Sequence, residues 1–291
     1  MARYEVPRHL QEGYREAEKI TKDHATIFYL ASKLLDKEKR YSAYAVYALC
    51  RLSDESVDNP GGSCAKDSLD AIEKKIAQAF GDAEQETPLL YAFRHSVEKY
   101  RIPQEYFQEM TAGMRMDLEK NRYRDFKELH EYCYRSAGVV GLIMLKIFGY
   151  KNRKAEGYAL NLGIAMQLTN ILRDIKEDFA RQRIYLPQDE MSKFQINQND
   201  ISEGSVSDDF KKFMGFQIQR ARQYYRDCLS GIGMINDLRC RLVTLAMKEL
   251  YEGILMKIEK NGYDVFSKRL RLNKAEKIMT LIKVLLRRKY L

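Results

Sequence analysis

Residues 167–187 contain carboxylate and amide side chains that recur at regular intervals. If this stretch is a helix, four of them share one face at spacings of three, four and four: Gln167, Asn170, Asp174 and Asp178. Two carboxylates one turn apart on an otherwise buried helix repel each other and lose hydration, so they need a neighbouring cation. Oxygen ligands of this kind suit a hard divalent ion, and the pattern indicates a Mg²⁺ site. The alternative is a solvated face whose aspartates pair with nearby basic residues: Arg173, Lys176 and Arg181.

A second stretch, residues 47–58, repeats this spacing of carboxylates. Asp54 and Asp58 lie four residues apart, and Arg51 precedes them by about one helical turn. Two such helices can face each other across a cavity, where four carboxylates would bind several Mg²⁺ ions. Those ions would hold a substrate diphosphate, and Arg51 and Arg173 would help to neutralise its charge. The two aspartate motifs together therefore predict a site for a diphosphate.

Further segments accompany the two aspartate motifs. In chain order the set is DESVD (54–58), GMRMDL (113–118), YCYRSAGVVG (132–141), NILRDIKED (170–178) and RIYLP (183–187). Together they resemble the squalene/phytoene synthase family, whose members join two prenyl diphosphates head to head. The resemblance runs in order from about His24 to Pro187 and continues more weakly into the basic C-terminal segment.

The resemblance implies a fold and a reaction. The expected fold is all-α, a single-domain helical bundle of the isoprenoid synthase type with a central cavity, over residues 1–291. The expected enzyme is a Mg²⁺-dependent prenyltransferase, with two or three Mg²⁺ ions, that condenses two farnesyl or geranylgeranyl diphosphates 1'-1 through a cyclopropyl diphosphate. Its product would be dehydrosqualene (4,4'-diapophytoene) or phytoene, in carotenoid biosynthesis. NADPH is not expected; squalene, which needs a hydride from NADPH, and presqualene diphosphate are the alternative products.

The resemblance also assigns roles to particular residues. Four aspartates would bind Mg²⁺: Asp54, Asp58, Asp174 and Asp178. Another group would contact diphosphate or metal-bound water: His24, Arg51, Gln167, Asn170 and Arg173. Four tyrosines would take the catalytic role of lining the region where positive charge develops, because an aromatic face stabilises a cation: Tyr47, Tyr134, Tyr185 and Tyr251.

The segment that begins at His24 departs from the family pattern. Family members commonly have His-Ser-Lys-Ser/Thr-Phe here, whose hydroxyls and lysine help to hold diphosphate, whereas this chain has His24-Ala25-Thr26-Ile27-Phe28. A histidine on such a mixed helix face, taken alone, indicates hydrogen-bonded structure rather than a ligand. Other basic residues would have to supply the missing donors: Lys22, Lys33, Arg271 or Lys274.

Two rival functions remain, and the first of them follows from this departure. One is a phosphatase that binds a single prenyl diphosphate and releases the alcohol. The other is a non-catalytic partner of an active synthase, against which the four clustered carboxylates argue, because a binding subunit does not need them. Condensation is the prediction.

Long helices must position these residues, because five prolines and sixteen glycines are few for 291 residues. No alternating strand pattern of useful length occurs, and no break in composition marks a linker. Residues 183–187 form a short exit segment. Apolar residues at spacings of three and four predict a series of helices in one all-α domain: residues 12–35, 41–59, 66–80, 87–101, 103–121, 132–150, 167–182, 210–230 and 238–261.

The amino-acid composition limits the classes of binding partner and the cell compartments that are expected for this protein. The net charge of +9 suits nucleic acid, an anionic membrane or phosphorylated substrates, but no nucleic-acid-binding module occurs, so nucleic acid is not expected. Five cysteines without a C-x-x-C pair argue against a disulfide framework or a zinc site and for a reducing compartment. No run of about eighteen apolar residues and no signal-peptide core occur. We expect a cytoplasmic protein.

Two apolar segments each have two interpretations. Within residues 132–150, Gly138 and Gly141 lower the helix propensity by about 1 kcal/mol each relative to alanine, which suits a backbone that closely approaches either an isoprenoid chain or another helix. The basic amphipathic segment at residues 268–291 either docks its apolar face on the bundle or lies on an anionic membrane surface. Peripheral association with the inner face of a membrane would suit an apolar product.

Overall fold

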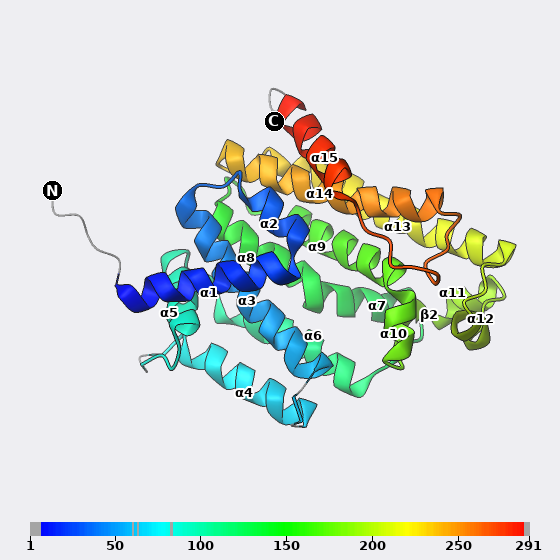
Figure 1. Cartoon of the computed structure of the whole chain (residues 1–291), viewed down its shortest axis with the longest axis horizontal. Helices are drawn as coiled ribbons and strands as arrows, with labels where there is room; N and C mark the ends of the chain where they lie inside the picture. Colours follow the sequence, from blue (N-terminus) through cyan, green and yellow to red (C-terminus); the bar gives the residue numbers. More distant parts are fainter. Residues whose placement is uncertain (1–6, 60, 63, 82–83, 288–291) are drawn as a thin grey trace.

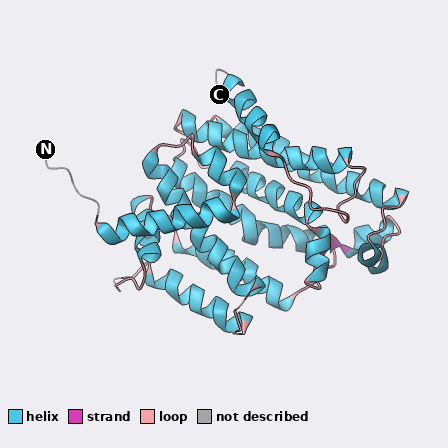
Figure 2. Cartoon of the chain, in the orientation of Figure 1, coloured by secondary structure: helices cyan, strands magenta, loops and turns pink. Residues whose placement is uncertain are grey.

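The structure is a computed structural model that describes residues 7–59, 61–62, 64–81 and 84–287. Nearly all of its regular structure is helical (Figure 2), which confirms the all-α prediction. Buried side chains form one cluster that extends from Leu10 to Val284. This continuity favours the predicted single domain, whose ends at residues 1–6 and 288–291 lie outside the described residues.

The N-terminal half consists of helices gathered around α3. Asp36 caps α3 and Thr87 caps α5, each by accepting a hydrogen bond from a backbone N–H in the first turn of its helix. α3 packs against α1, α4, α5 and α6, so neighbouring helices hold the first aspartate motif on several sides. The bounds are α1 (Arg8–His24), α2 (Thr26–Ser32), α3 (Lys37–Asp58), α4 (Ala65–Gln78), α5 (Pro88–Lys99) and α6 (Gln104–Glu119).

The C-terminal half is built around α9, which runs through the middle of the bundle (Figure 1) and packs against α8, α13 and α14. Its elements begin with β1 (Arg122–Tyr123), α7 (Phe126–Cys133), the π-helix η1 (Tyr134–Gly138), α8 (Val139–Phe148), α9 (Lys154–Arg173) and α10 (Ile175–Ala180). They continue with β2 (Ile184–Pro187), α11 (Gln188–Lys193), α12 (Gln198–Glu203), α13 (Asp208–Ile232), α14 (Leu238–Lys260) and α15 (Lys274–Leu286).

Two predicted helices are interrupted. The helix predicted over residues 12–35 breaks at Ala25, where φ is −129° and ψ is 61°. The helix predicted over residues 167–182 breaks at Asp174, where φ is −105° and ψ is 17°. The side chain of Asp174 is held by an arginine from a distant part of the chain, a contact that local spacing does not report. Both breaks lie within the predicted site.

The helix predicted over residues 132–150 has a π-helical turn near its start. Other helices approach this turn closely, since a Cβ on Gly163 of α9 would lie 2.3 Å from the carbonyl oxygen of Ala137. π-helical turns are rare and are frequent at functional sites. The turn changes which side chains of this segment face the interior.

Two short strands, β1 and β2, are not predicted from the sequence. They pair in parallel, with Arg122 opposite Ile184. With two and four residues, they are too short to leave an alternating pattern. Their pairing ties the exit segment, residues 183–187, to the chain that follows α6.

The last helix, α15, lies at the outer edge of the bundle on α14 (Figure 1). It begins with a capping box in which Asn273 and Glu276 each bond the backbone N–H of the other. Among the described residues, no helix combines the length and the apolar character needed to span a bilayer.

Candidate active site

A cavity of about 780 Å³ lies inside the bundle, and its wall changes character along α9. The lining residues are mostly apolar from Ala155 to Met166 and polar from Gln167 to Arg173. At 1.5 Å per residue, this wall extends over about 27 Å of helix. The apolar lining continues on α8: Val140, Met144, Leu145 and Phe148. The cavity therefore has a polar end and a long apolar arm.

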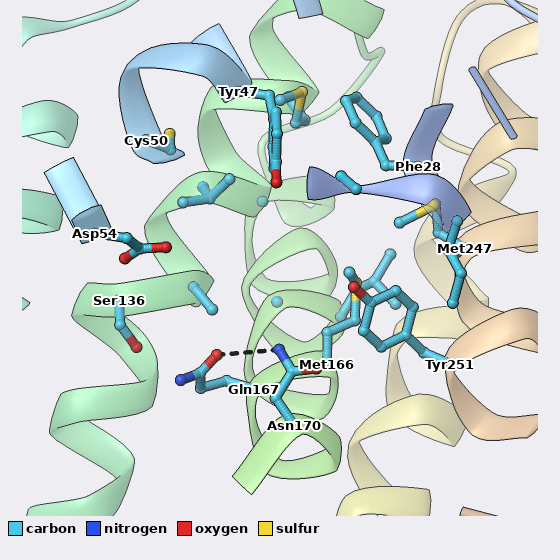
Figure 3. A pocket seen from close by; sticks show the side chains of 18 of the residues that line it. Phe28, Tyr47, Cys50, Asp54, Ser136, Met166, Gln167, Asn170, Met247 and Tyr251 are labelled. Carbon is cyan, nitrogen blue, oxygen red and sulfur yellow. Dashed lines mark hydrogen bonds between the residues drawn. The ribbon is translucent and has the colours of Figure 1, made fainter. Parts of the chain in front are cut away.

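The structure brings almost all of the predicted site residues together around this cavity. Figure 3 shows Tyr47 and Tyr251 pointing into the same space from α3 and α14. Tyr134 does not line the cavity. The predicted residues that do are His24, Tyr47, Arg51, Asp54, Asp58, Gln167, Asn170, Arg173, Asp174, Asp178, Tyr185 and Tyr251.

The first aspartate motif stands on the last two turns of α3. Asp58 accepts a hydrogen bond from Arg183 at 2.7 Å, and Arg181 lies 3.7 Å from its other oxygen. Within the described residues, no hydrogen bond or ion pair joins the side chain of Asp54 to a partner. Burial raises the pKa of Asp54 to about 7; Arg51 opposes this shift, whereas Asp58 adds to it.

The second aspartate motif spans the break between α9 and α10. Asp174 pairs with Arg173 at 2.7 Å and with Arg269 at 2.6 Å. Burial alone would raise the pKa of Asp174, but these two guanidinium groups outweigh it and hold the pKa below its ordinary value. The side chain of Asp178 has no such partner in the described part of the chain. Burial and the nearby Asp174 raise the pKa of Asp178 to about 8.

The predicted diphosphate-binding residues make few contacts that would prevent them from binding a ligand. Arg51 pairs with Glu55 one turn later at 2.8 Å, and the His24 ring lies 3.8 Å from the same carboxylate. Asn170 donates to Gln167 at 3.4 Å, a long hydrogen bond that Figure 3 shows at the base of the cavity. The Oδ1 atom of Asn170 is buried and has no hydrogen-bond partner among the described residues.

The donor set at the polar end fits a divalent cation. Among the described residues, no three His, Cys, Asp or Glu side chains are already gathered as a metal site. However, the carboxylates of Asp54 and Asp178 lack a paired charge, and the pKa of each is raised further by Asp117, so the two motifs lie within electrostatic reach of one residue. With the orphaned oxygen of Asn170, they present the oxygen ligands that Mg²⁺ prefers. A bound cation would supply the missing charge.

Asp117 of α6 lines the cavity, and it is a residue to which the sequence analysis assigns no catalytic or binding role. Its carboxylate accepts hydrogen bonds from the hydroxyls of Tyr185 at 2.7 Å and Tyr132 at 3.0 Å. The two tyrosine rings stack with their centroids 4.9 Å apart. Burial raises the pKa of Asp117 to about 6, although Arg183 and both hydroxyls favour its charged form. Its place in the GMRMDL segment is the one signal in the sequence that could have pointed to it.

Tyr132, rather than the predicted Tyr134, is the tyrosine of this segment that lines the cavity. Residues two positions apart on a helix point to nearly opposite sides, so the two cannot share one wall. Tyr134 is half-buried at the first position of η1. The structure therefore brings Tyr132 to the cavity instead of Tyr134, and the catalytic role of Tyr134 stays a prediction.

The two glycines of this segment make contacts with α9. A Cβ on Gly141 would lie 2.3 Å from the carbonyl oxygen of Ala159, which is too close for any side chain. Gly138 does not line the cavity, and a Cβ there would meet Leu160 at an ordinary 3.4 Å. Of the two interpretations, close helix packing is therefore the one that the structure supports at Gly141, although this residue also borders the cavity.

The segment between α14 and α15 adds basic residues to the polar end. Arg269, Arg271 and Lys277 line the cavity. Lys277 donates a hydrogen bond to the hydroxyl of Thr26 at 3.0 Å, so side chains from the C-terminal segment reach the stretch that departs from the family pattern. Among the residues predicted to compensate for that departure, Arg271 is at the cavity, and three are not in its lining: Lys22, Lys33 and Lys274.

Comparisons with known proteins agree with these features. A family model described as "Squalene/phytoene synthase" matches residues 21–276. The chain is 39% identical over 273 residues to the 15-cis-phytoene synthase of Synechococcus elongatus, with 89% of this chain and 88% of the relative covered. It is 38% identical over 291 residues to the phytoene synthase of Arthrospira platensis, with 95% of this chain and 93% of the relative covered.

Solved structures with the same architecture include a dehydrosqualene synthase in complex with ligand. Its TM-score is 0.91 at 28% identity, with 98% of this chain and 99% of that chain covered. The squalene synthase HpnC from Alicyclobacillus acidocaldarius has a TM-score of 0.81 at 26% identity, with 89% of this chain and 97% of that chain covered. The predicted bundle of the isoprenoid synthase type is therefore confirmed.

Proposed function

We propose that this chain, which belongs to the squalene/phytoene synthase family, joins two molecules of geranylgeranyl diphosphate head to head and forms phytoene. As a prenyltransferase of carotenoid biosynthesis, it acts on prenyl diphosphates. The observation that supports the proposal is the composition of the cavity wall, which has both aspartate motifs at its polar end and a long apolar arm beyond them. The chain length of the substrate rests on the phytoene synthases at 38–39% identity.

The reaction takes place in two steps, and each step releases one diphosphate and one proton. In the first, the C–O bond of one diphosphate breaks, the double bond of the second molecule attacks the allylic cation, and loss of a proton gives the cyclopropyl diphosphate. In the second, this intermediate loses its own diphosphate, rearranges and releases another proton. Both steps create a diphosphate anion and a carbocation in the same cavity, so the protein must stabilise both charges and exclude water.

Basic residues at the polar end would stabilise the leaving diphosphate. Arg51, Arg173 and Arg269 line this end, and each guanidinium group can bind phosphate oxygens in a bidentate manner. We assign the holding of Mg²⁺ to five residues, which would keep the ions beside these arginines: Asp54, Asp58, Asn170, Asp174 and Asp178. When bound, Mg²⁺ neutralises diphosphate charge and so lowers the barrier to ionisation.

Aromatic residues would stabilise the carbocation. Tyr47 and Tyr251 present their rings to the cavity (Figure 3), and ring faces attract cations. Tyr132 and Tyr185 lie next to each other with their hydroxyls on Asp117, which keeps the rings in one orientation. We assign this group to the reacting carbons because it lines the cavity, and because Asp117 acts electrostatically on one aspartate of each motif, Asp54 and Asp178.

A second candidate substrate is farnesyl diphosphate, which would give dehydrosqualene. The structural similarity to a dehydrosqualene synthase favours it. One experiment separates the two candidates from each other and from the phosphatase. The purified protein is incubated with Mg²⁺ and either diphosphate, with and without NADPH, and the lipid product is identified by its mass.

Phytoene from geranylgeranyl diphosphate without NADPH is the expected result. A C30 hydrocarbon from farnesyl diphosphate alone would move the proposal to the second candidate. Geranylgeraniol or farnesol as the only product at saturating substrate would reject condensation in favour of the phosphatase. For its location, we propose the cytoplasm with peripheral attachment to a membrane.

A further inference from the structure

The face of α15 that meets the bundle combines apolar and polar contacts. Val284 is the one residue of α15 that is fully buried among those described, and Leu281 packs beside it against the core. Glu276 pairs with Lys257 of α14 at 2.8 Å, and Arg287, just after the helix, lies 3.3 Å from Glu249. An ordinary surface helix turns most of its large apolar side chains toward such contacts, whereas α15 turns few of them inward.

The outer face of α15 is apolar. It exposes five large side chains, from 39% of the surface of Leu285 to 71% for Leu286. At 3.6 residues per turn, the five fall within an arc of about 120°. The described residues include nine large apolar side chains that are this exposed, so a single short helix carries more than half of them. The five are Ile278, Met279, Ile282, Leu285 and Leu286.

Basic residues border this arc on both sides. Lys274 lies at one edge and Lys283 at the other, and both are exposed. An apolar arc between lysines is the pattern of a helix that lies in the plane of a membrane interface, with its apolar side among the acyl chains and its lysines at the headgroups. The chain as a whole carries a net charge of +9, which adds to the attraction of an anionic surface.

The position of α15 connects this face to the cavity. Arg271 and Leu272, just before the helix, and Lys277 in its first turns all line the cavity. Figure 1 shows α15 at the edge of the bundle, where it crosses α14 obliquely. A membrane surface in contact with the outer face of α15 would therefore lie close to one wall of the cavity.

We propose that the outer face of α15 docks this protein on the surface of an anionic lipid bilayer, with Ile278, Ile282 and Leu286 inserted among the acyl chains. A second copy of the chain is the less suitable occupant, because a symmetric contact would bring the lysines of both copies together. Docking also goes beyond the proposed reaction, since it concerns a surface outside the cavity. It would place the cavity beside the phase in which an apolar product dissolves.

Vesicle binding in the absence of substrate tests this proposal separately from catalysis. Wild-type protein is centrifuged with vesicles of phosphatidylcholine alone and with vesicles that also contain phosphatidylglycerol. Ile282→Asp places a charge in the centre of the outer face. Leu229→Asp is the matched control, because it makes the same change of charge at a residue of α13 that is 42% exposed.

The expected result is strong binding to the anionic vesicles and weak binding to the neutral ones. Ile282→Asp should lower the partition coefficient at least about tenfold, whereas Leu229→Asp should change it less than about twofold. Lys283→Ala should lower it about fivefold, an effect that fades at high salt. Circular dichroism checks that each variant is folded, and Lys283→Ala keeps the test decisive if Ile282→Asp is not.

Three results would overturn the proposal. They are absence of wild-type binding to anionic vesicles, equal binding of the two aspartate variants, and a lipid-free dimer in sedimentation that Ile282→Asp dissociates. The last result would identify a second copy of the chain as the occupant of the outer face. None of them bears on product formation, so the proposed function would stand or fall on its own experiment.

Discussion

The two aspartate motifs solve the same electrostatic problem with different parts of the chain. In each, one carboxylate has an arginine partner and the other has none among the described residues. Asp58 on α3 is held by Arg183, and Asp174 after α9 is held by Arg173 and Arg269. The partners of the first motif come from the exit segment after α10, whereas the second motif uses its own neighbour and the C-terminal segment.

Each motif thus keeps one carboxylate that has no paired arginine among the described residues, and both of these carboxylates line the cavity. Burial raises the pKa of Asp54 to about 7 and that of Asp178 to about 8, so the cation-free protein bears a cost at each position. Functional sites commonly retain features that lower stability. The unpaired aspartates therefore indicate where a cation would bind. The paired aspartates are instead neutralised by arginines of the protein.

Removal of an unpaired aspartate is expected to have the largest effect. Asp54→Asn and Asp178→Asn should each lower kcat by about 10³-fold, because each removes charge that would hold the cation at the leaving diphosphate. Product formation under Mg²⁺ titration measures this, with circular dichroism as the control for folding. Chelation by EDTA should abolish wild-type turnover. Full activity in EDTA would contradict the metal site, and a large effect in only one variant would show that the two motifs are not equivalent.

Removal of an arginine partner should lower the stability of the fold, and the loss should be larger for the first motif than for the second. The Arg183 side chain is 12% exposed, and its loss would leave Asp58 and Asp117 without their main counter-charge, so Arg183→Gln should destabilise the fold by about 2 kcal/mol. The Arg269 side chain is 36% exposed, and Arg173 would still pair with Asp174, so Arg269→Gln should cost less than about 1 kcal/mol. Denaturant unfolding of the cation-free proteins compares them. Equal costs would mean that burial of the partner does not distinguish the motifs.

Asp117 acts electrostatically on one aspartate of each motif, and its replacement should have a smaller effect on catalysis. Asp117→Ala should lower kcat about 10- to 30-fold with little change in KM, because it removes the acceptor of both the Tyr132 and the Tyr185 hydroxyl without removing a ring. In a double-mutant cycle, Tyr132→Phe should add little to the loss, since both changes break the same hydrogen bond. Additive losses would show that Asp117 acts independently of Tyr132.

The pH dependence of stability should give the smallest effect. A carboxyl group whose pKa is raised on folding binds its proton more tightly in the folded state, so the stability that it supports is lost as pH rises from about 4 to 8. Asp54→Asn should therefore stabilise the cation-free protein by about 1 kcal/mol at pH 8, where cavity water screens part of the cost, and by almost nothing at pH 4. Thermal melting at the two values measures the difference. A difference in melting temperature between wild type and variant that is the same at both pH values would show that folding does not raise the pKa of Asp54.

Much of this protein is determined by local sequence. Apolar spacing predicts the long helices, because a helical face recurs every three to four residues whatever surrounds it. The same rule places Asp54 beside Asp58 on α3. The resemblance to the squalene/phytoene synthase family then leads to twelve residues that line one cavity.

The rest was decided by contacts between distant parts of the chain. The choice of Tyr132 over Tyr134 depends on how the π-helical turn meets its neighbours, and the break at Asp174 accompanies its pairing with Arg269, 95 positions away. The sequence also shows that α15 is amphipathic, but periodicity specifies only that one face is apolar. Which way that face points depends on the contacts of α15 with the bundle, the ion pair of Glu276 with Lys257 and the burial of Val284 among them, and these exist only once the bundle has formed.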